Sequence, residues 1–138
     1  MTIQLTPHFS LEELTKTDTG LDNTPSPSVT EVLRTTAFYM EKVRDLLKVA
    51  INVNSGYRSP KVNKAVGGSN HSAHMLGYAV DFTAKGISPL DVCKIISGSG
   101  LKFDQLIYEK FWTHISFDPK MRGELLTKDG NGFIKGIV

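Results

Sequence analysis

The stretch from His71 to Phe82, HSAHMLGYAVDF, places two of the chain's four histidines directly before a strand-like segment. Residues 78–83 are predicted to form a strand. Because side chains alternate across a strand, Ala79 and Asp81 share one face while the larger apolar side chains share the other. Asp81 is therefore a carboxylate on an otherwise apolar strand. Two interpretations follow: the stretch is half of a metal site, or it is a polar loop that enters a buried strand.

A second predicted strand, over residues 112–117, carries another histidine, His114. If the two strands are neighbours, His114 can meet Asp81, and Gly77 allows a turn that folds the imidazole of His74 back over the sheet. Two histidines and one carboxylate then leave a fourth tetrahedral position for water, as in a catalytic zinc site. Spacing alone leaves open the alternative that these are ordinary surface or core residues.

Composition limits the class of protein. The 138 residues suit one domain over residues 1–138, large enough to bury a core without disulfides or metals. The 16 basic residues are scattered among 14 acidic ones, which disfavours nucleic acid as a partner, while a pI near 8.7 permits approach to an anionic bacterial wall. Cys93, the single cysteine, excludes an internal disulfide and is expected to pack in the core. Zinc would therefore be held by nitrogen and oxygen.

The amino terminus, MTIQLTPHFSLEEL, has neither the charged region nor the apolar core of a signal peptide. No apolar run approaches the length of a membrane span either. We therefore expect a protein that is cytoplasmic on synthesis and is not inserted in a membrane. We also expect it to be a monomer. Work at the cell wall would need release by phage lysis or carriage in a virion.

The order of predicted elements indicates an α+β fold, a single domain with a small, mainly antiparallel sheet packed against helices. Ser10 with Glu13, and Ser28 with Glu31, read as capping boxes at two helix starts. Residues 128–138 fit no predicted element. The predicted helices cover residues 11–16, 28–48, 61–65 and about 89–98, and the predicted strands cover 51–55, 78–83, 103–108 and 112–117, with a tight turn at 109–111.

Four sequence elements resemble one known family. Residues Ser72 to Asp81 match the S-x-H-x-x-G-x-A-x-D signature of the zinc D-Ala-D-Ala carboxypeptidases, the M15 peptidases. Trp112 to His114 looks like the later W-x-H element, Ser55 to Ser59 resembles its S-G-Y-R-S element, and Asn63 to Gly68 is similar to members of the small, single-domain branch. The resemblance extends from Phe9 to about Ser116 in the family's order and spacing.

The resemblance implies that His74, Asp81 and His114 bind one Zn²⁺ ion, in the α+β fold shared with the hedgehog signalling domain. It also implies cleavage of peptidoglycan stem peptides in the manner of a D-Ala-D-Ala carboxypeptidase, with a zinc-bound water as nucleophile. Three alternatives stay open: a peptidoglycan endopeptidase of the phage endolysin or virion type, a non-catalytic zinc-containing wall-binding module, and a metal-free wall-binding domain.

Glu109 is the predicted general base, because it ends a strand five residues before His114 and can reach a water across a short turn. Many relatives carry an acidic residue three positions before the last histidine, where this chain has Phe111. The assignment therefore assumes a longer turn. Asp104 is a weaker substitute, and the alternative is that Glu109 is only a solvated turn residue.

Arg58 and Ser72 complete the predicted site. The guanidinium of Arg58 suits a substrate carboxylate or the oxyanion that forms on the scissile carbonyl, which gives it a substrate-binding and a catalytic role. Ser72 is expected to bind substrate or orient a metal ligand, the alternative being that it only caps a turn. His71 is placed at the rim at most, and His8 outside the site.

Overall fold

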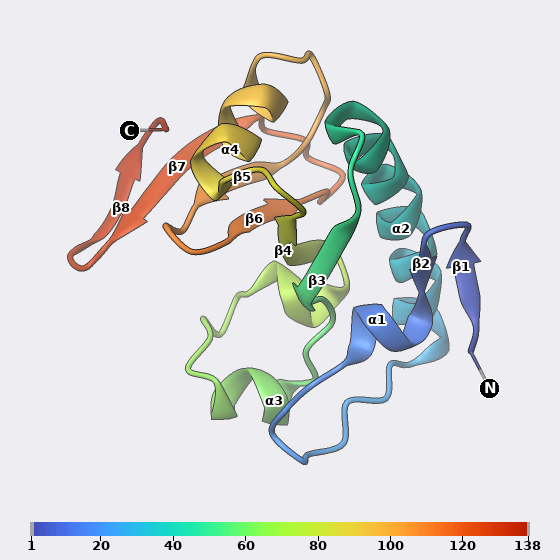
Figure 1. The fold of residues 1–138 in the computed structure, drawn as a ribbon. Helices are drawn as coiled ribbons and strands as arrows, with labels where there is room; N and C mark the ends of the chain where they lie inside the picture. The colour runs from blue at the N-terminus through green and yellow to red at the C-terminus, as the bar shows by residue number, and fades with distance from the viewer. Residues whose placement is uncertain (1, 138) are drawn as a thin grey trace.

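A six-stranded sheet forms the framework of the computed structural model, which describes residues 2–137 (Figure 1). Its strand order is β3-β4-β6-β5-β7-β8, and every neighbouring pair is antiparallel except β5 and β7. The strands are β3 (Ile51–Ser55), β4 (Ala79–Ala84), β5 (Gln105–Tyr108), β6 (Thr113–Ser116), β7 (Glu124–Asp129) and β8 (Gly132–Lys135). The architecture confirms the predicted α+β class.

The remaining elements surround this sheet. A small two-stranded sheet, β1 (Gln4–Thr6) with β2 (Phe9–Ser10), precedes the first helix and was not predicted. The helices are α1 (Leu11–Thr15), α2 (Pro27–Leu47), α3 (Pro60–Ala65) and α4 (Pro89–Ser97), with a short 3₁₀ helix, η1 (Ala73–Leu76), between α3 and β4. Within residues 2–137, no helix combines the length and apolar character needed to cross a membrane.

Three of the helices begin in the same way, with proline in the first turn and the preceding serine as N-cap. The serines are Ser26, Ser59 and Ser88, and each hydroxyl accepts a backbone N–H from the first turn. The capping box of Ser10 and Glu13 at α1 is confirmed. The one predicted at Ser28 is wrong, because Pro27 already has the fixed φ of a first helical residue and moves the start upstream to Ser26.

Helices α2 and α4 cover one face of the sheet, where the hydrophobic core lies. Alternate strand residues on this face are completely buried, among them Val80, Phe82, Leu106 and Ile115. Cys93 on α4 is buried there too, with its Sγ 3.7 Å from Thr113 Oγ1. The alternation leaves the opposite face to Asp81 and His114, so the core and the candidate site share the same strands.

The segment after β6, unassigned in the sequence, extends the sheet. Arg122 binds Asp104 through two side-chain hydrogen bonds of 2.9 Å, Nε to Oδ1 and Nη2 to Oδ2, and these hold the pKa of Asp104 below its usual range. This ion pair fixes the connection that leads into β7, which then runs parallel to β5. The chain turns back at residues 130–131, and β8 becomes an edge of the sheet.

Candidate metal centre

Asp81 and His114 face each other across the β4–β6 ladder, as the strand parity predicted. Residues opposed in an antiparallel pair have Cβ atoms about 4.5–5.5 Å apart, close enough for their side chains to bond. His114 Nδ1 lies 2.9 Å from Asp81 Oδ1, within hydrogen-bonding distance. Both side chains are buried, with exposed fractions of 11% for His114 and 9% for Asp81. The pairing of β4 with β6 therefore brings two of the three candidate ligands together.

His74 comes from η1, which ends at Gly77 in the left-handed conformation, φ 85°, before the chain enters β4. Its Nδ1 lies 2.7 Å from the carbonyl oxygen of Gly56. A carbonyl only accepts, so Nδ1 carries the proton and Nε2 faces Asp81 Oδ1, 3.3 Å away. The Gly56 carbonyl thus fixes both the tautomer and the orientation of the ring.

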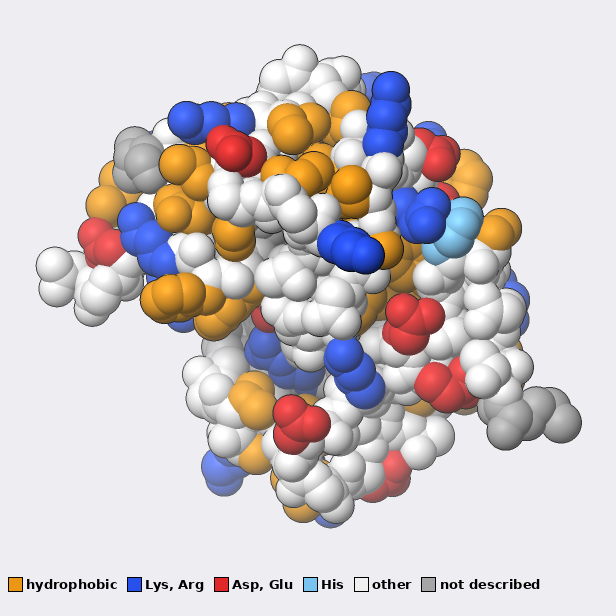
Figure 2. All heavy atoms as spheres, in the orientation of Figure 1, with side chains coloured by type: hydrophobic (Ala, Val, Ile, Leu, Met, Phe, Trp, Pro, Cys, Tyr) orange, Lys and Arg blue, Asp and Glu red, His pale blue; other side chains and the backbone are white. Residues whose placement is uncertain are grey.

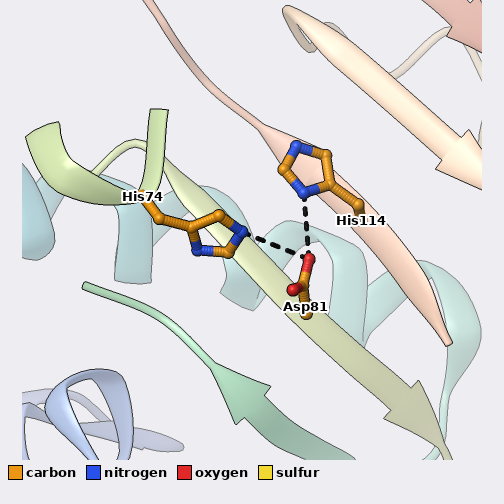
Figure 3. A group of neighbouring side chains, drawn as sticks. All are labelled: His74, Asp81 and His114. Atoms are coloured by element: carbon orange, nitrogen blue, oxygen red, sulfur yellow. Dashed lines mark hydrogen bonds and ion pairs between the residues drawn. The ribbon is translucent and has the colours of Figure 1, made fainter. Parts of the chain in front are cut away.

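This arrangement fits a metal cation. In the neutral form of His74, the lone pair of Nε2 would face a carboxylate oxygen 3.3 Å away. Two acceptors this close repel each other, and a cation bound by both would remove the repulsion. One donor atom from each of His74, Asp81 and His114 lies within 4.8 Å of the others, and Figure 3 shows the three side chains converging. Two imidazole nitrogens and one carboxylate oxygen suit zinc with an open fourth position.

Electrostatics keep Asp81 ionised. Burial by itself would raise its pKa, but the neighbouring imidazoles of His114 and His74 outweigh burial and hold the pKa of Asp81 well below the usual range of a carboxyl group. Its second oxygen, Oδ2, accepts from Nη2 of Arg58 at 3.3 Å. A charged carboxylate is the form that binds a metal, so no proton has to leave Asp81 first.

Arg58 lies beside the three candidate ligands, as the sequence predicted. Besides Asp81, its guanidinium donates to Ser55 Oγ and to Asn63 Oδ1, both at 3.2 Å. Its backbone N–H also donates to the carbonyl of His74 at 3.1 Å. With 15% of its side chain exposed, Arg58 is held by these contacts and still has further N–H donors that could meet a ligand.

Glu109 also reaches the site. Its Oε2 lies 4.0 Å from His114 Nδ1, and its side chain is only 11% exposed. The longer turn assumed from the sequence is present: Glu109 N–H donates to the carbonyl of Trp112 at 3.1 Å, and Lys110 takes a left-handed φ of 68°. Phe111 is 82% exposed on this turn. Glu109 is therefore not a solvated turn residue.

Other candidates lie elsewhere or have other contacts. Asp104 is paired with Arg122 at the opposite end of β5 from Glu109, which excludes it as the substitute base. Ser72 caps η1 by accepting the backbone N–H of His74 at 3.2 Å, the third of its predicted alternatives. His71 is exposed. His8 bonds Glu41 through Nδ1 at 2.7 Å, away from the site.

Sequence reasoning missed the residues that support the ligands. Gly56 orients His74, while Ser55 and Asn63 hold Arg58. Lys128 on β7 places its Nζ 3.7 Å from Glu109 Oε1. The first three lie in the family-like elements Ser55–Ser59 and Asn63–Gly68, which were the available signal. Nothing local marks Lys128, because its strand was not predicted.

Comparison with known proteins adds one match. The family model described as Peptidase M15 matches residues 7–116, which include His74, Asp81, His114, Arg58 and Glu109 but not Lys128. No curated protein gives a significant match.

Proposed function

The chain belongs to the peptidase M15 family, as its sequence motifs indicated, and from this premise we propose that it is a zinc-dependent peptidase that hydrolyses peptidoglycan stem peptides, D-Ala-D-Ala carboxypeptidase-like in its chemistry. One observation carries the proposal: a buried set of two histidines and a carboxylate within 4.8 Å, with a further carboxylate, Glu109, 4.0 Å from His114. That is a ligand set with an acid–base group beside it.

The residues of the site have distinct roles in this reaction. His74, Asp81 and His114 would hold the ion, which when bound polarises the scissile carbonyl and acidifies water. Glu109 accepts the proton of the attacking water and passes it to the leaving amine, since its carboxylate is the nearest acid that the three ligands leave available. Arg58 uses its further N–H donors for the substrate's carboxylate or for the charge that develops on the carbonyl oxygen.

The position of Glu109 supports an enzyme over a non-catalytic wall-binding module. A module that used the metal only for structure would need the three ligands and their supporting contacts. It would have no use for a mostly buried carboxylate beside the ligands, whose desolvation is costly. In this chain Lys128 offsets part of that cost through its ion pair with Glu109.

The test is to incubate the zinc-loaded protein with purified muropeptides and identify the products by mass spectrometry, with metal content measured in parallel. We expect cleavage by the wild type. Glu109→Ala should lower the rate by about 10²–10⁴-fold while the protein keeps its metal, because only proton transfer is removed. His114→Ala should lose both cleavage and stoichiometric metal.

His8→Ala is the matched histidine control and should retain cleavage and metal, since His8 bonds only Glu41 in the contacts described. Robust cleavage by Glu109→Ala would remove Glu109 as the base. If the zinc-loaded wild type cleaves no stem peptide, the proposed substrate class is wrong. The masses of the products also separate a carboxypeptidase, which releases a terminal residue, from an endopeptidase.

A further inference from the structure

The face of the sheet that carries the metal centre continues onto the hairpin β7–β8. Across the strands, His114 is paired with Ile107, Ile107 with Leu126, and Leu126 with Lys135. Residues paired directly across neighbouring strands point to the same face. Lys135 therefore stands in the same row as Asp81 and His114, three strands away from His114.

A second row runs beside the first. Lys128 is paired with Phe133 across the hairpin, and its Nζ lies 3.7 Å from Glu109 Oε1 and 5.8 Å from the centre of the Phe133 ring. These two contacts place Lys128 and Phe133 on the face of Glu109, independently of the strand register. The ion pair joins the hairpin directly to the proposed base.

We call the five side chains on this extension the hairpin platform: Ile107, Leu126, Lys128, Phe133 and Lys135. The helices α2 and α4 lie against the other face of the sheet. On the platform Phe133 is 59% exposed, both lysines are exposed, Leu126 is half-buried, and Ile107 is buried beneath them. Figure 2 shows hydrophobic and basic side chains together over the β7–β8 region. The platform is thus an open surface beside the site.

The charges on the platform favour an anionic occupant. Lys128 keeps 52% of its side chain exposed despite its ion pair, and Lys135 takes part in none of the ion pairs found among residues 2–137. The acidic group in the neighbouring row, Glu124, is held by Gln105 Nε2 at 2.6 Å. An apolar floor with an uncompensated ammonium group suits a peptide that carries a free carboxylate.

We propose that the hairpin platform is a substrate subsite, in which the peptide chain crosses Leu126 beside Phe133 and a carboxylate of the stem peptide binds Lys135. This inference rests on the proposed function. Three strand spacings separate His114 from Lys135, roughly 14 Å, which is about four residues of extended peptide. The platform therefore selects stem peptides with a carboxylate about four residues from the cleaved bond.

Steady-state kinetics on purified muropeptides test the subsite. Lys135→Glu should raise KM about three- to tenfold, the size expected when an exposed ion pair is replaced by repulsion, with kcat unchanged. The rise should shrink at high salt, since exposed charges are screened. Lys135→Arg should restore the wild-type KM. Lys102→Glu, the same charge reversal on an exposed loop before β5, is the control and should keep the wild-type KM.

A binding measurement separates this inference from the proposed function. The metal-free protein, which cannot turn over, is titrated with the same muropeptides while backbone amide shifts are followed by NMR. We expect shifts at residues 124–135 in the wild type and their loss in Lys135→Glu. Cleavage by the wild type with a silent hairpin, or a KM for Lys135→Glu within twofold of wild type, overturns the platform. Hairpin shifts without any cleavage overturn the peptidase assignment and leave the platform standing.

Discussion

Asp81 connects nearly all of the candidate site. Its Oδ1 faces both imidazoles and its Oδ2 faces Arg58, so one carboxylate sets the positions of three cationic or metal-binding groups. A single buried acid can hold this many neighbours because Arg58 stabilises its charge and a bound cation would join it to the two imidazoles. The SGYRS segment matters for the same reason: it supplies both Arg58 and the carbonyl that orients His74.

Gly56 should be the most sensitive position of that segment. A Cβ there would overlap the carbonyl oxygen of Leu14, which also accepts the N–H of Tyr57 at 2.7 Å. We expect Gly56→Ala to lower the free energy of unfolding by about 1–3 kcal/mol. It should also weaken zinc binding by about 10–100-fold, because the carbonyl that orients His74 moves.

Urea unfolding and a zinc titration against a competing chelator measure the two effects. Gly130→Ala is the matched control, since a Cβ at Gly130 would contact nothing within 4 Å. Unchanged zinc affinity in Gly56→Ala would show that the Gly56 carbonyl does not position His74.

At the scale of elements, the serine–proline helix starts give a paired prediction. Ser26→Ala should cost about 1 kcal/mol of unfolding free energy, because its hydroxyl caps α2 by accepting the N–H of Val29. Ser28→Ala should cost much less, since Ser28 lies inside the first turn. Urea unfolding of both variants checks this. Equal costs for the two variants would contradict the assignment of Ser26 as the cap.

Strong local signals made most elements predictable. The periodicity of α2 and the alternation in β3, β4 and β6 gave those elements nearly at their observed bounds. The start of α2 was misplaced because Ser26 and Ser28 both precede helix-compatible residues, and only the place of Pro27 decides between them. Strands β7 and β8 were missed because they lie in a glycine-rich stretch, and because β7 pairs in parallel with β5, a partner that no local sequence pattern indicates.

The candidate site was predictable to a similar degree. Strand parity placed Asp81 with His114, and the family motif selected His74 over His71. The supporting contacts were not predictable, because Gly56 acts through its backbone and Lys128 through a tertiary pairing. Neither the Gly56 contact nor the Lys128 contact can be inferred from the identity of the side chains in the sequence.

At the scale of the whole molecule, Cys93 reports on the integrity of the core. Burial between α4 and the sheet raises the pKa of the Cys93 thiol to about 11. Because the folded pKa lies above the unfolded value of about 8.5, the thiol contributes stability that is complete below about pH 8.5. That contribution is lost as the pH rises through about 11.

Two measurements follow from this burial. Unfolding free energy should decline between about pH 8.5 and 11 more steeply in the wild type than in Cys93→Ala. At pH 8, labelling of Cys93 by a thiol reagent should follow the unfolded fraction as urea is added. Stoichiometric labelling in native buffer within minutes would mean that the thiol is accessible without unfolding.

The pairing of β4 with β6 also governs when the site comes into existence as the chain folds. The contact between Asp81 and His114 joins residues 33 apart in sequence, and the one between His74 and Gly56 joins residues 18 apart. Closing such loops carries an entropic cost that only the assembled sheet offsets, and non-local pairing of this kind is slow. No early helix can therefore hold the ligands together, and during refolding the capacity to bind a metal emerges with the final cooperative step.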